Sequence, residues 1–299
     1  MRVFMTGATG FIGSYLVPAL LKEGHQVIGL CRSAESADKL VRAGAEAFLG
    51  DLNDLDRLRA GANLGDAVIH AAFNHDFARV RQHSEEDRKV IEALGDALCG
   101  SERPLLVTSG TGLVERQSGA SSVVETDNHA SLEKAPRAAT EEAAAAVFAK
   151  GARVIVMRLP QVHDTRHQGR IAQHIRLARE NGRVACIGDG GNRLPAVHVS
   201  DAVRLFGLAL EHGRAGARYH AVAEEGVPMR DIAEVIGAGL NLPVESITPE
   251  AASGYFGGLA GLAATDLAAS SALTRQELGW TPTGPDLLTD LRQMEWVAT

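Results

Sequence analysis

Three glycines near the N-terminus have the spacing of a phosphate-binding turn. They stand in TGATGFIG, directly after a short apolar run and before a helical pattern. Glycine lets the main chain approach a pyrophosphate closely, and the helix that follows offers free N–H groups and the positive end of its dipole. The strand-turn-helix context favours nucleotide binding over an ordinary tight turn. The expected dinucleotide contacts in this turn are Gly7, Thr9, Gly10, Phe11, Ile12 and Gly13.

The second apolar run ends in a cation and a hydroxyl, Arg32 and Ser33. An NAD site is expected to place an acidic residue there for the ribose 2′-hydroxyl. A guanidinium suits a 2′-phosphate instead, because it makes paired, charge-assisted hydrogen bonds to phosphate oxygens. The sequence therefore predicts NADP(H) as the cofactor; the alternative is that Arg32 ends a strand in solvent. Asp51 and Leu52, after the third run, are expected near the adenine, although Asp after Gly is also ordinary turn chemistry.

Short apolar runs alternate with longer helical patterns, as expected for parallel strands joined by crossover helices. The expected strands are 3–6, 26–31, 47–49, 67–72, 105–109, 154–159 and 218–222. The expected helices are near 11–23, 36–43, 54–60, 84–98, 137–150, 170–181, 201–211 and 229–240. The pattern predicts an α/β fold with a doubly wound parallel sheet of the Rossmann type over 1–165. A smaller C-terminal substrate lobe is expected over 166–299, with a segment near 196–222 returning to the sheet.

Composition points to a globular protein with a small-molecule partner. The chain has 299 residues, 45% of them hydrophobic, and a formal net charge of -7 with its 30 Lys and Arg residues scattered, so nucleic acid is not expected as a partner. The three cysteines are far apart, and His163 and His167 have no third ligand of matching spacing, so neither a disulfide framework nor a metal site is expected.

The N-terminus leaves no room for a signal peptide, which fits a cytoplasmic protein. The most apolar long stretch, 254–264, is shorter than the roughly 20 residues of a membrane span. We interpret it as a buried or subunit-facing helix, and no membrane association is expected.

Several motifs in order along the chain resemble the short-chain dehydrogenase/reductase superfamily. They are TGATGFIG, Gly50-Asp51-Leu52, His70-Ala71-Ala72 and Thr108-Ser109-Gly110. The later pieces RLPQVH, VHVSD and ELGWTP resemble its NAD(P)-dependent epimerase/dehydratase branch. The resemblance covers nearly the whole chain. It implies a Rossmann domain, a C-terminal lobe that closes over the nicotinamide, often a homodimer, and further cofactor contacts at Ala71, Ala72 and Thr108.

The chain departs from that family at the proton donor, which is a Tyr followed four residues later by a Lys. None of the three tyrosines, Tyr15, Tyr219 and Tyr255, has a lysine at that spacing. The piece PRAATE takes the place of the family's motif and puts Arg137 and Glu141 where the pair would stand. The resemblance thus implies cofactor binding without the family's acid/base pair, as in its atypical members.

Three residues are candidates for the chemistry. Reduction of a carbonyl needs a hydride and a preorganised donor at the oxygen that gains charge. Ser109 is expected at the carboxyl end of the fifth strand, where open sheets bind ligands. His163 can titrate near neutral pH at the junction of the lobes, with a structural role as the alternative. Arg137 would bind an anionic group or stabilise charge, and Glu141 is spaced to pair with it one helical turn later.

We therefore expect an NADP(H)-dependent oxidoreductase that acts by hydride transfer on a carbonyl or alcohol of a small, mainly apolar molecule. One alternative is a redox sensor or scaffold that binds NADP(H) without chemistry, since the Tyr and Lys are missing. Another is a sugar-nucleotide epimerase or dehydratase. That activity calls for a clamp of basic residues on the diphosphate, which Arg170, Arg176, Arg179 and Arg183 only partly supply.

Overall fold

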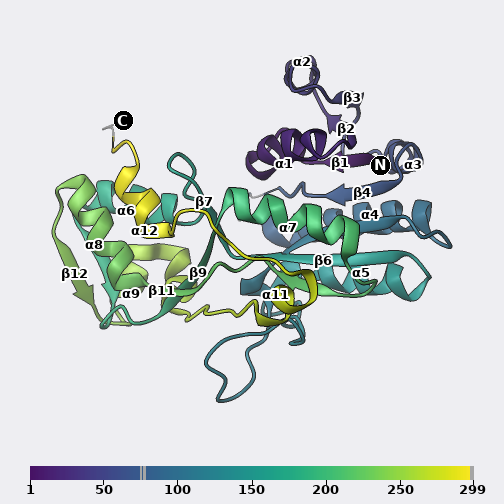
Figure 1. Ribbon diagram of the computed structural model, residues 1–299. Coiled ribbons are helices and arrows are strands. Elements are labelled where there is room, and N and C mark those ends of the chain that lie inside the picture. The colour runs from purple at the N-terminus through teal and green to yellow at the C-terminus, as the bar shows by residue number, and fades with distance from the viewer. Residues whose placement is uncertain (75, 77–78, 297–299) are drawn as a thin grey trace.

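The computed structural model describes residues 1–74, 76 and 79–296. Its centre is a seven-stranded, fully parallel sheet in the order β10-β6-β5-β4-β1-β2-β3 (Figure 1). The strands are β1 (Arg2–Thr6), β2 (Gln26–Cys31), β3 (Glu46–Leu49), β4 (Ala67–His70), β5 (Pro104–Gly110), β6 (Arg153–Leu159) and β10 (Arg218–His220). The predicted Rossmann-type sheet is confirmed, and each of its strands overlaps an expected one.

Helices cover both faces of this sheet because its central strands are apolar on both sides. One face packs against α1 (Phe11–Lys22) and α7 (Val199–His212), and the other against α3 (Leu55–Asn63), α4 (Val80–Leu98) and α5 (Ala139–Ala149). The shorter α2 (Ala34–Arg42) is capped by the preceding residue, Ser33, whose hydroxyl accepts a hydrogen bond from the Ser36 amide at 3.2 Å. Such a cap satisfies one of the free donors in the first turn.

A second lobe follows β6 and has its own core (Figure 1). Its strands form a three-stranded sheet in the order β11-β9-β7 and a two-stranded sheet of β12 and β8. The bounds are β7 (Gln161–His163), β8 (Val184–Ile187), β9 (Arg193–His198), β11 (Glu224–Pro228) and β12 (Val244–Ile247). The helices α6 (Ile171–Asn181), α8 (Met229–Leu240) and α12 (Leu287–Gln293) pack on them, while α11 (Ala272–Leu278) lies against α7 and β10.

The single helix predicted over 254–264 is wrong. The structure has α9 (Ala252–Phe256), the 3-10 turn η4 (Gly257–Leu259) and α10 (Ala260–Ala264) in its place. Gly257 has a φ of +56°, which breaks the helical backbone. In this segment only Ala252, Tyr255 and Phe256 are buried. Of the described helices, none is long and apolar enough to cross a membrane.

Candidate functional site

The glycine-rich turn packs directly against the end of β4. Gly7 has a φ of +72°, and a Cβ at this position would lie 2.7 Å from main-chain atoms of Ala71 and Ala72. A Cβ on Gly13 would lie 2.1 Å from the Gly7 carbonyl oxygen. The Gly10 amide donates to that same carbonyl at 3.0 Å. The turn is therefore held as a tight loop at the carboxyl edge of the sheet, in contact with Ala71 and Ala72.

The first turn of α1 is open to an anion. Its N-cap is Gly10, no side chain caps it within the described residues, and its first turn carries no acidic residue. Thr9 and Gly10 are exposed, whereas Phe11 and Ile12 are half-buried. Free N–H groups and the helix dipole at such an end favour a phosphate group. These residues fit the pyrophosphate of a dinucleotide.

Substitution of Gly13 by alanine tests this turn. The new Cβ would collide with the main chain of Gly7 and Ala8. We expect the displaced turn to weaken NADPH binding by at least about tenfold, since cofactor affinity depends on close backbone approach. Fluorescence titration with NADPH measures the loss, and circular dichroism reports whether the variant folds. Gly254→Ala is the control, because a Cβ there meets nothing within 4 Å; equal affinity of wild type and Gly13→Ala would contradict the assignment.

At the other end of the expected cofactor site, Arg32 and Ser33 follow β2 and are exposed. The structure gives Arg32 no ion pair with any residue it describes, so its guanidinium is free for an anion. Ser33 caps α2. The Asp51 carboxylate accepts from the amide and side chain of Asn53 at 2.9 and 2.7 Å, which is turn chemistry, and Leu52 packs against the core.

A buried chain of polar groups supports the edge of the sheet beneath the turn. Thr6 Oγ1 lies 2.7 Å from His70 Nδ1 and accepts from the Ala72 amide at 3.3 Å. His70 Nε2 lies 2.8 Å from the carboxylate of Asp87, which also accepts from the Thr140 hydroxyl at 2.5 Å. This chain couples β1, β4, α4 and α5. The sequence analysis identified only the His70-Ala71-Ala72 motif, because Asp87 and Thr140 lie far from it along the chain.

Ser109 lies in a second buried network, with Glu141 and Arg158. The Ser109 hydroxyl donates to Glu141 at 2.7 Å. Arg158 is fully buried and donates to both oxygens of that carboxylate, at 2.8 and 2.7 Å. Burial opposes ionisation of Glu141, but Arg158 and the Ser109 hydroxyl hold its pKa below the usual value. The hydroxyl proposed to hold a substrate oxygen thus serves a buried ion pair, while its catalytic role stays a prediction.

The predicted pairing of Arg137 with Glu141 is wrong. Arg137 lies in the 3-10 turn η3 (Pro136–Ala138), ahead of α5, and Glu141 faces Arg158. The Arg137 guanidinium instead covers the ring of Phe73 at 4.0 Å from its centroid, just past the end of β4. Its Nε atom is buried and has no hydrogen-bond partner among the residues that the structure describes. Burial lowers the pKa of Arg137, and the charge of Asp87 partly opposes this.

Thr108 adds a second buried atom without a partner near the same edge. This residue lies in β5, and its Oγ1 makes no hydrogen bond to any residue that the structure describes. Such atoms are rare in folded proteins and call for an explanation. Thr108 and Arg137 are therefore candidates to form hydrogen bonds with a bound ligand at the carboxyl edge of the sheet.

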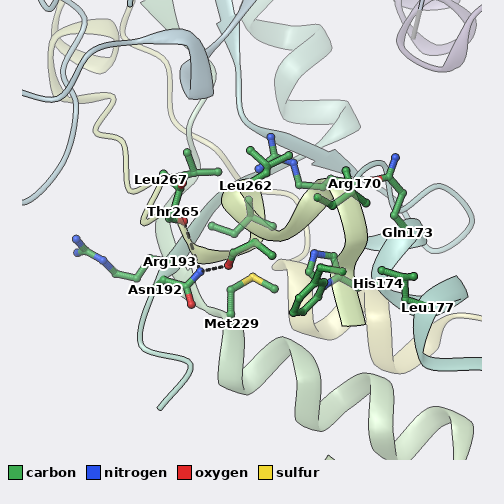
Figure 2. Close-up of a pocket in the computed structure, with 14 residues that line it drawn as sticks. Arg170, Gln173, His174, Leu177, Asn192, Arg193, Met229, Leu262, Thr265 and Leu267 are labelled. Atoms are coloured by element: carbon green, nitrogen blue, oxygen red, sulfur yellow. Dashed lines mark hydrogen bonds between the residues drawn. The ribbon is translucent and has the colours of Figure 1, made fainter. Parts of the chain in front are cut away.

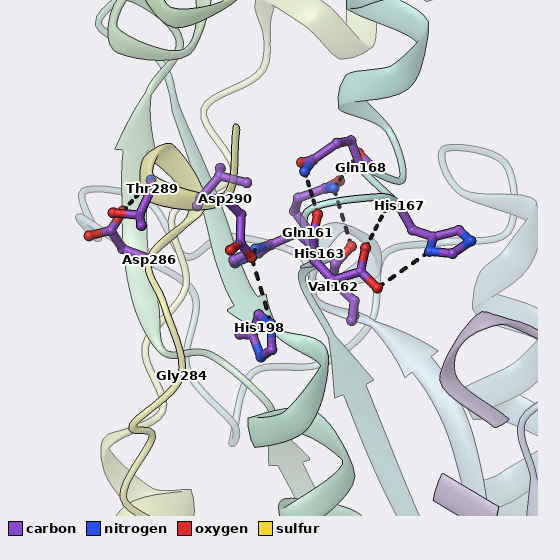
Figure 3. Close-up of polar contacts among 12 residues, drawn as sticks. Gln161, Val162, His163, His167, Gln168, His198, Gly284, Asp286, Thr289 and Asp290 are labelled. Atoms are coloured by element: carbon purple, nitrogen blue, oxygen red, sulfur yellow. Dashed lines mark hydrogen bonds and ion pairs between the residues drawn. The ribbon is translucent and has the colours of Figure 1, made fainter. Parts of the chain in front are cut away.

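His163 lies deeper than the sequence suggested. It is fully buried, and its Nδ1 is 2.8 Å from Asp290 in α12 (Figure 3). Its Nε2 has no hydrogen-bond partner within the described part of the chain. Glu224 is 4.0 Å from that Nε2, and the ring meets His198 edge to face. Burial lowers the pKa of His163, against the effect of Asp290. This arrangement joins β7 to α12 and favours the structural role over proton donation.

The loop after β7 contacts helix α1 next to the glycine-rich turn. The Tyr15 hydroxyl of α1 donates to Asp164 at 2.8 Å. The ring of His167 stacks on Phe11, with centroids 4.5 Å apart. Asp164 also accepts from the amides of Arg166 and His167, at 2.7 and 2.5 Å. The second lobe therefore reaches over the N-terminal end of α1.

Known proteins resemble this chain over almost its full length. An uncharacterized protein of Schizosaccharomyces pombe is 44% identical over 292 residues, which is 97% of this chain and 98% of that protein. A sterol-4-alpha-carboxylate 3-dehydrogenase (decarboxylating) of Dictyostelium discoideum is 26% identical over 247 residues, covering 77% of this chain and 73% of that protein. Among solved structures, a dTDP-glucose 4,6-dehydratase from Streptomyces venezuelae with bound NAD superposes with a TM-score of 0.75 at 20% identity, covering 98% and 96% of the two chains.

The family match covers the part of the chain that contains the glycine-rich turn and the central sheet. The NAD dependent epimerase/dehydratase family matches residues 3–223, which include the whole glycine-rich turn and every strand of the central sheet from Val3 onward. This family comprises nicotinamide-dinucleotide-dependent oxidoreductases, epimerases and dehydratases of the short-chain dehydrogenase/reductase type, and the chain belongs to it.

Proposed function

We propose that the protein is an NADP(H)-dependent oxidoreductase that reduces the carbonyl of a small, mainly apolar molecule, with Arg137 as the donor to the carbonyl oxygen. The position of Arg137 carries the proposal: its guanidinium covers Phe73 at the end of β4, and its Nε atom is buried without a partner. The dehydrogenase named among its relatives acts on a sterol, an apolar molecule, and supports this substrate class.

Different residues of the chain would bind the cofactor and the substrate carbonyl. The cofactor, when bound, would supply a hydride to the carbonyl carbon. Gly7, Gly10 and Gly13 would hold its pyrophosphate, Arg32 would hold its 2′-phosphate, and Thr108 would bind a polar group near the nicotinamide. Arg137 would hydrogen-bond the carbonyl oxygen and stabilise the negative charge that develops there, and solvent would supply the proton. A preorganised donor in a partly desolvated site is effective because it needs no reorganisation during the reaction.

Titration with NADPH and NADH, followed by NADPH-oxidation assays on aldehydes, ketones and quinones, tests the proposal. We expect tighter binding of NADPH than of NADH, and turnover of at least one carbonyl compound. Equal or weaker binding of NADPH would overturn the cofactor assignment.

Arg32→Asp tests cofactor choice separately. We expect NADPH binding to weaken by at least about tenfold, because a charge-assisted phosphate contact worth about 1.5 kcal/mol or more is lost and an acid is placed against the 2′-phosphate. NADH binding should be retained, because its ribose carries a hydroxyl there. Arg42→Asp, at the far end of α2, removes a similar exposed charge and should leave both affinities unchanged. Equal loss of NADPH and NADH affinity in Arg32→Asp would mean that the arginine is structural.

A non-catalytic NADP(H)-binding sensor is the second candidate. The specific observation in its favour is the buried ion pair between Glu141 and Arg158. The family resemblance implies the catalytic lysine at position 141, and this chain has a carboxylate there instead. Tight NADPH binding without turnover of any carbonyl compound in the panel would support this function over the reductase.

A further inference from the structure

The second lobe contains a pocket that borders the edge of the central sheet (Figure 2). A Cβ on Gly112, in the turn after β5, would lie 3.8 Å from Arg170 Nη2 and 3.9 Å from Leu267, and both of these residues line the pocket. Most of its wall is apolar, with contributions from Leu177, Leu194, Met229, Phe256, Leu259 and Leu262. The pocket therefore lies beside the strand end where the nicotinamide is proposed to bind.

Three of the six polar side chains in this wall, those of Asn192, Arg193 and Thr265, are paired within the described residues. Arg193 makes two hydrogen bonds to the Asp266 carboxylate, at 3.1 and 2.8 Å, and Asp266 also binds Arg116. The Asn192 amide donates to the Ala263 carbonyl at 2.9 Å (Figure 2). Burial, with the nearby charge of Arg170, lowers the pKa of His174 to about 4, so this ring is neutral at pH 7.

Arg170 is the one charged side chain of the wall that has no partner among the described residues, since Arg193 pairs with Asp266. Its backbone amide donates to Gln161, but its guanidinium has no hydrogen bond or ion pair to any part of the chain that the structure describes. Burial alone lowers the pKa of Arg170, and no carboxylate offsets this cost. A half-buried guanidinium stays charged, and leaving it unpaired in an apolar wall destabilises the fold.

We propose that this pocket binds the carboxylate of the substrate, with Arg170 as its paired hydrogen-bond donor and the apolar wall around the substrate's body. The inference rests on the proposed function and specifies its substrate class as a small apolar carboxylic acid. One free guanidinium matches the single charge and planar shape of a carboxylate. A diphosphate carries more charge and would need a second free cation, whereas Arg193 is neutralised by Asp266.

The pocket must open to admit such a ligand. Its enclosed volume is about 20 Å³, enough for about one water molecule. The segment Ala252–Ala264 supplies Phe256, Leu259 and Leu262 to the wall and contains four glycines. Gly254, Gly257, Gly258 and Gly261 are exposed, and a Cβ on any of them would meet nothing within 4 Å, so this side of the segment faces solvent. We assign the opening movement to this segment.

Calorimetric titration of the full-length protein with 4-phenylbutyrate and with the neutral analogue 4-phenylbutan-1-ol tests the charge preference. We expect the carboxylate to bind at least about tenfold more tightly, because a charge-assisted contact is worth about 1.5–3 kcal/mol. Arg170→Met should abolish that preference. Arg176→Met is the matched control, since Arg176 lies on the same helix, is exposed and pairs with Glu180. Equal binding of acid and alcohol to the wild type would overturn the inference, as would tighter binding of inorganic phosphate or UDP-glucose.

Thermal unfolding separates a ligand-binding role from a structural one. Arg170→Met removes an unpaired charge, so we expect it to unfold at the same or a higher temperature than the wild type. A clear loss of stability would mean that Arg170 supports the fold and would overturn its assignment to the ligand. The NADPH affinity of Arg170→Met is measured as well, and it shows independently whether the cofactor site is intact. Loss of the carboxylate preference in Arg170→Met with no turnover in any assay supports the pocket and contradicts only the reductase; turnover without any carboxylate preference contradicts only the pocket.

Discussion

Glu141→Gln is expected to lower the free energy of unfolding by about 3 kcal/mol or more, the usual cost of breaking a buried ion pair. The substitution keeps the shape of the side chain but leaves Arg158, which is fully buried, without its counter-charge. Arg158 also donates to the carbonyl oxygens of Glu125 and Asp127, so the loss extends to the segment that packs over the sheet edge. Arg158→Met should be destabilising to a similar extent, because Glu141 then remains buried and unpaired.

Urea denaturation followed by circular dichroism measures both variants. Glu142→Gln is the matched control, since Glu142 is the next residue and pairs with Arg88 in a partly exposed position. Its loss should stay below about 1 kcal/mol, as for other exposed pairs. A Glu141→Gln variant as stable as Glu142→Gln would show that the buried pair does not stabilise the fold.

The same ion pair determines the expected effect of placing a lysine at position 141, where the family resemblance implies the catalytic lysine. A lysine at position 141 would face Arg158 and the hydroxyl of Ser109, with like charges buried together. We expect Glu141→Lys to be less stable than Glu141→Gln. The buried arginine and the carboxylate opposite it are thus expected to stabilise the fold as a pair.

The central sheet could be predicted from the sequence because local signals coincide there. The runs VFMT, QVIGLC and VIVMRL are apolar and bounded by turns, and the glycine spacing predicts which edge of the sheet binds phosphate. The strands of the second lobe were not predicted. They are short, and β7, β9 and β11 pair across 161–228 of the chain. Their pairing depends on tertiary packing that no local pattern records.

The site was predicted in part for the same reason. The tight turn at Gly7 follows from the glycine spacing, whereas Ala71 and Ala72 were expected near the cofactor only from the family resemblance. The partner of Glu141 does not, because Arg158 lies on β6 whereas Glu141 lies on α5, and the helical spacing to Arg137 offered a nearer cation. That spacing assumed a continuous helix, whereas η3 turns Arg137 away toward Phe73. A carboxylate and an arginine in one segment are therefore only candidates for an ion pair, and the three-dimensional structure decides which side chains pair.

Arg137→Met is expected to lower kcat by about 100-fold on the best carbonyl substrate, the typical effect of removing one preorganised donor to a developing oxyanion. NADPH affinity should change by less than about threefold, because a methionine retains the apolar contact with Phe73 and the cofactor is held elsewhere. Arg137→Lys should recover part of the rate, since it restores the charge but not the paired donors of the guanidinium.

Single-turnover oxidation of NADPH in a stopped-flow instrument separates this chemical step from cofactor binding. A slower hydride step at unchanged NADPH affinity, with partial recovery in Arg137→Lys, supports the donor role. An unchanged hydride step in Arg137→Met would remove Arg137 from the reaction, and a raised KM with unchanged kcat would reassign it to substrate binding. A merely structural role would instead lower stability and affect Arg137→Lys and Arg137→Met alike. The buried Nε without a partner argues against that role, because the fold gains no hydrogen bond from it.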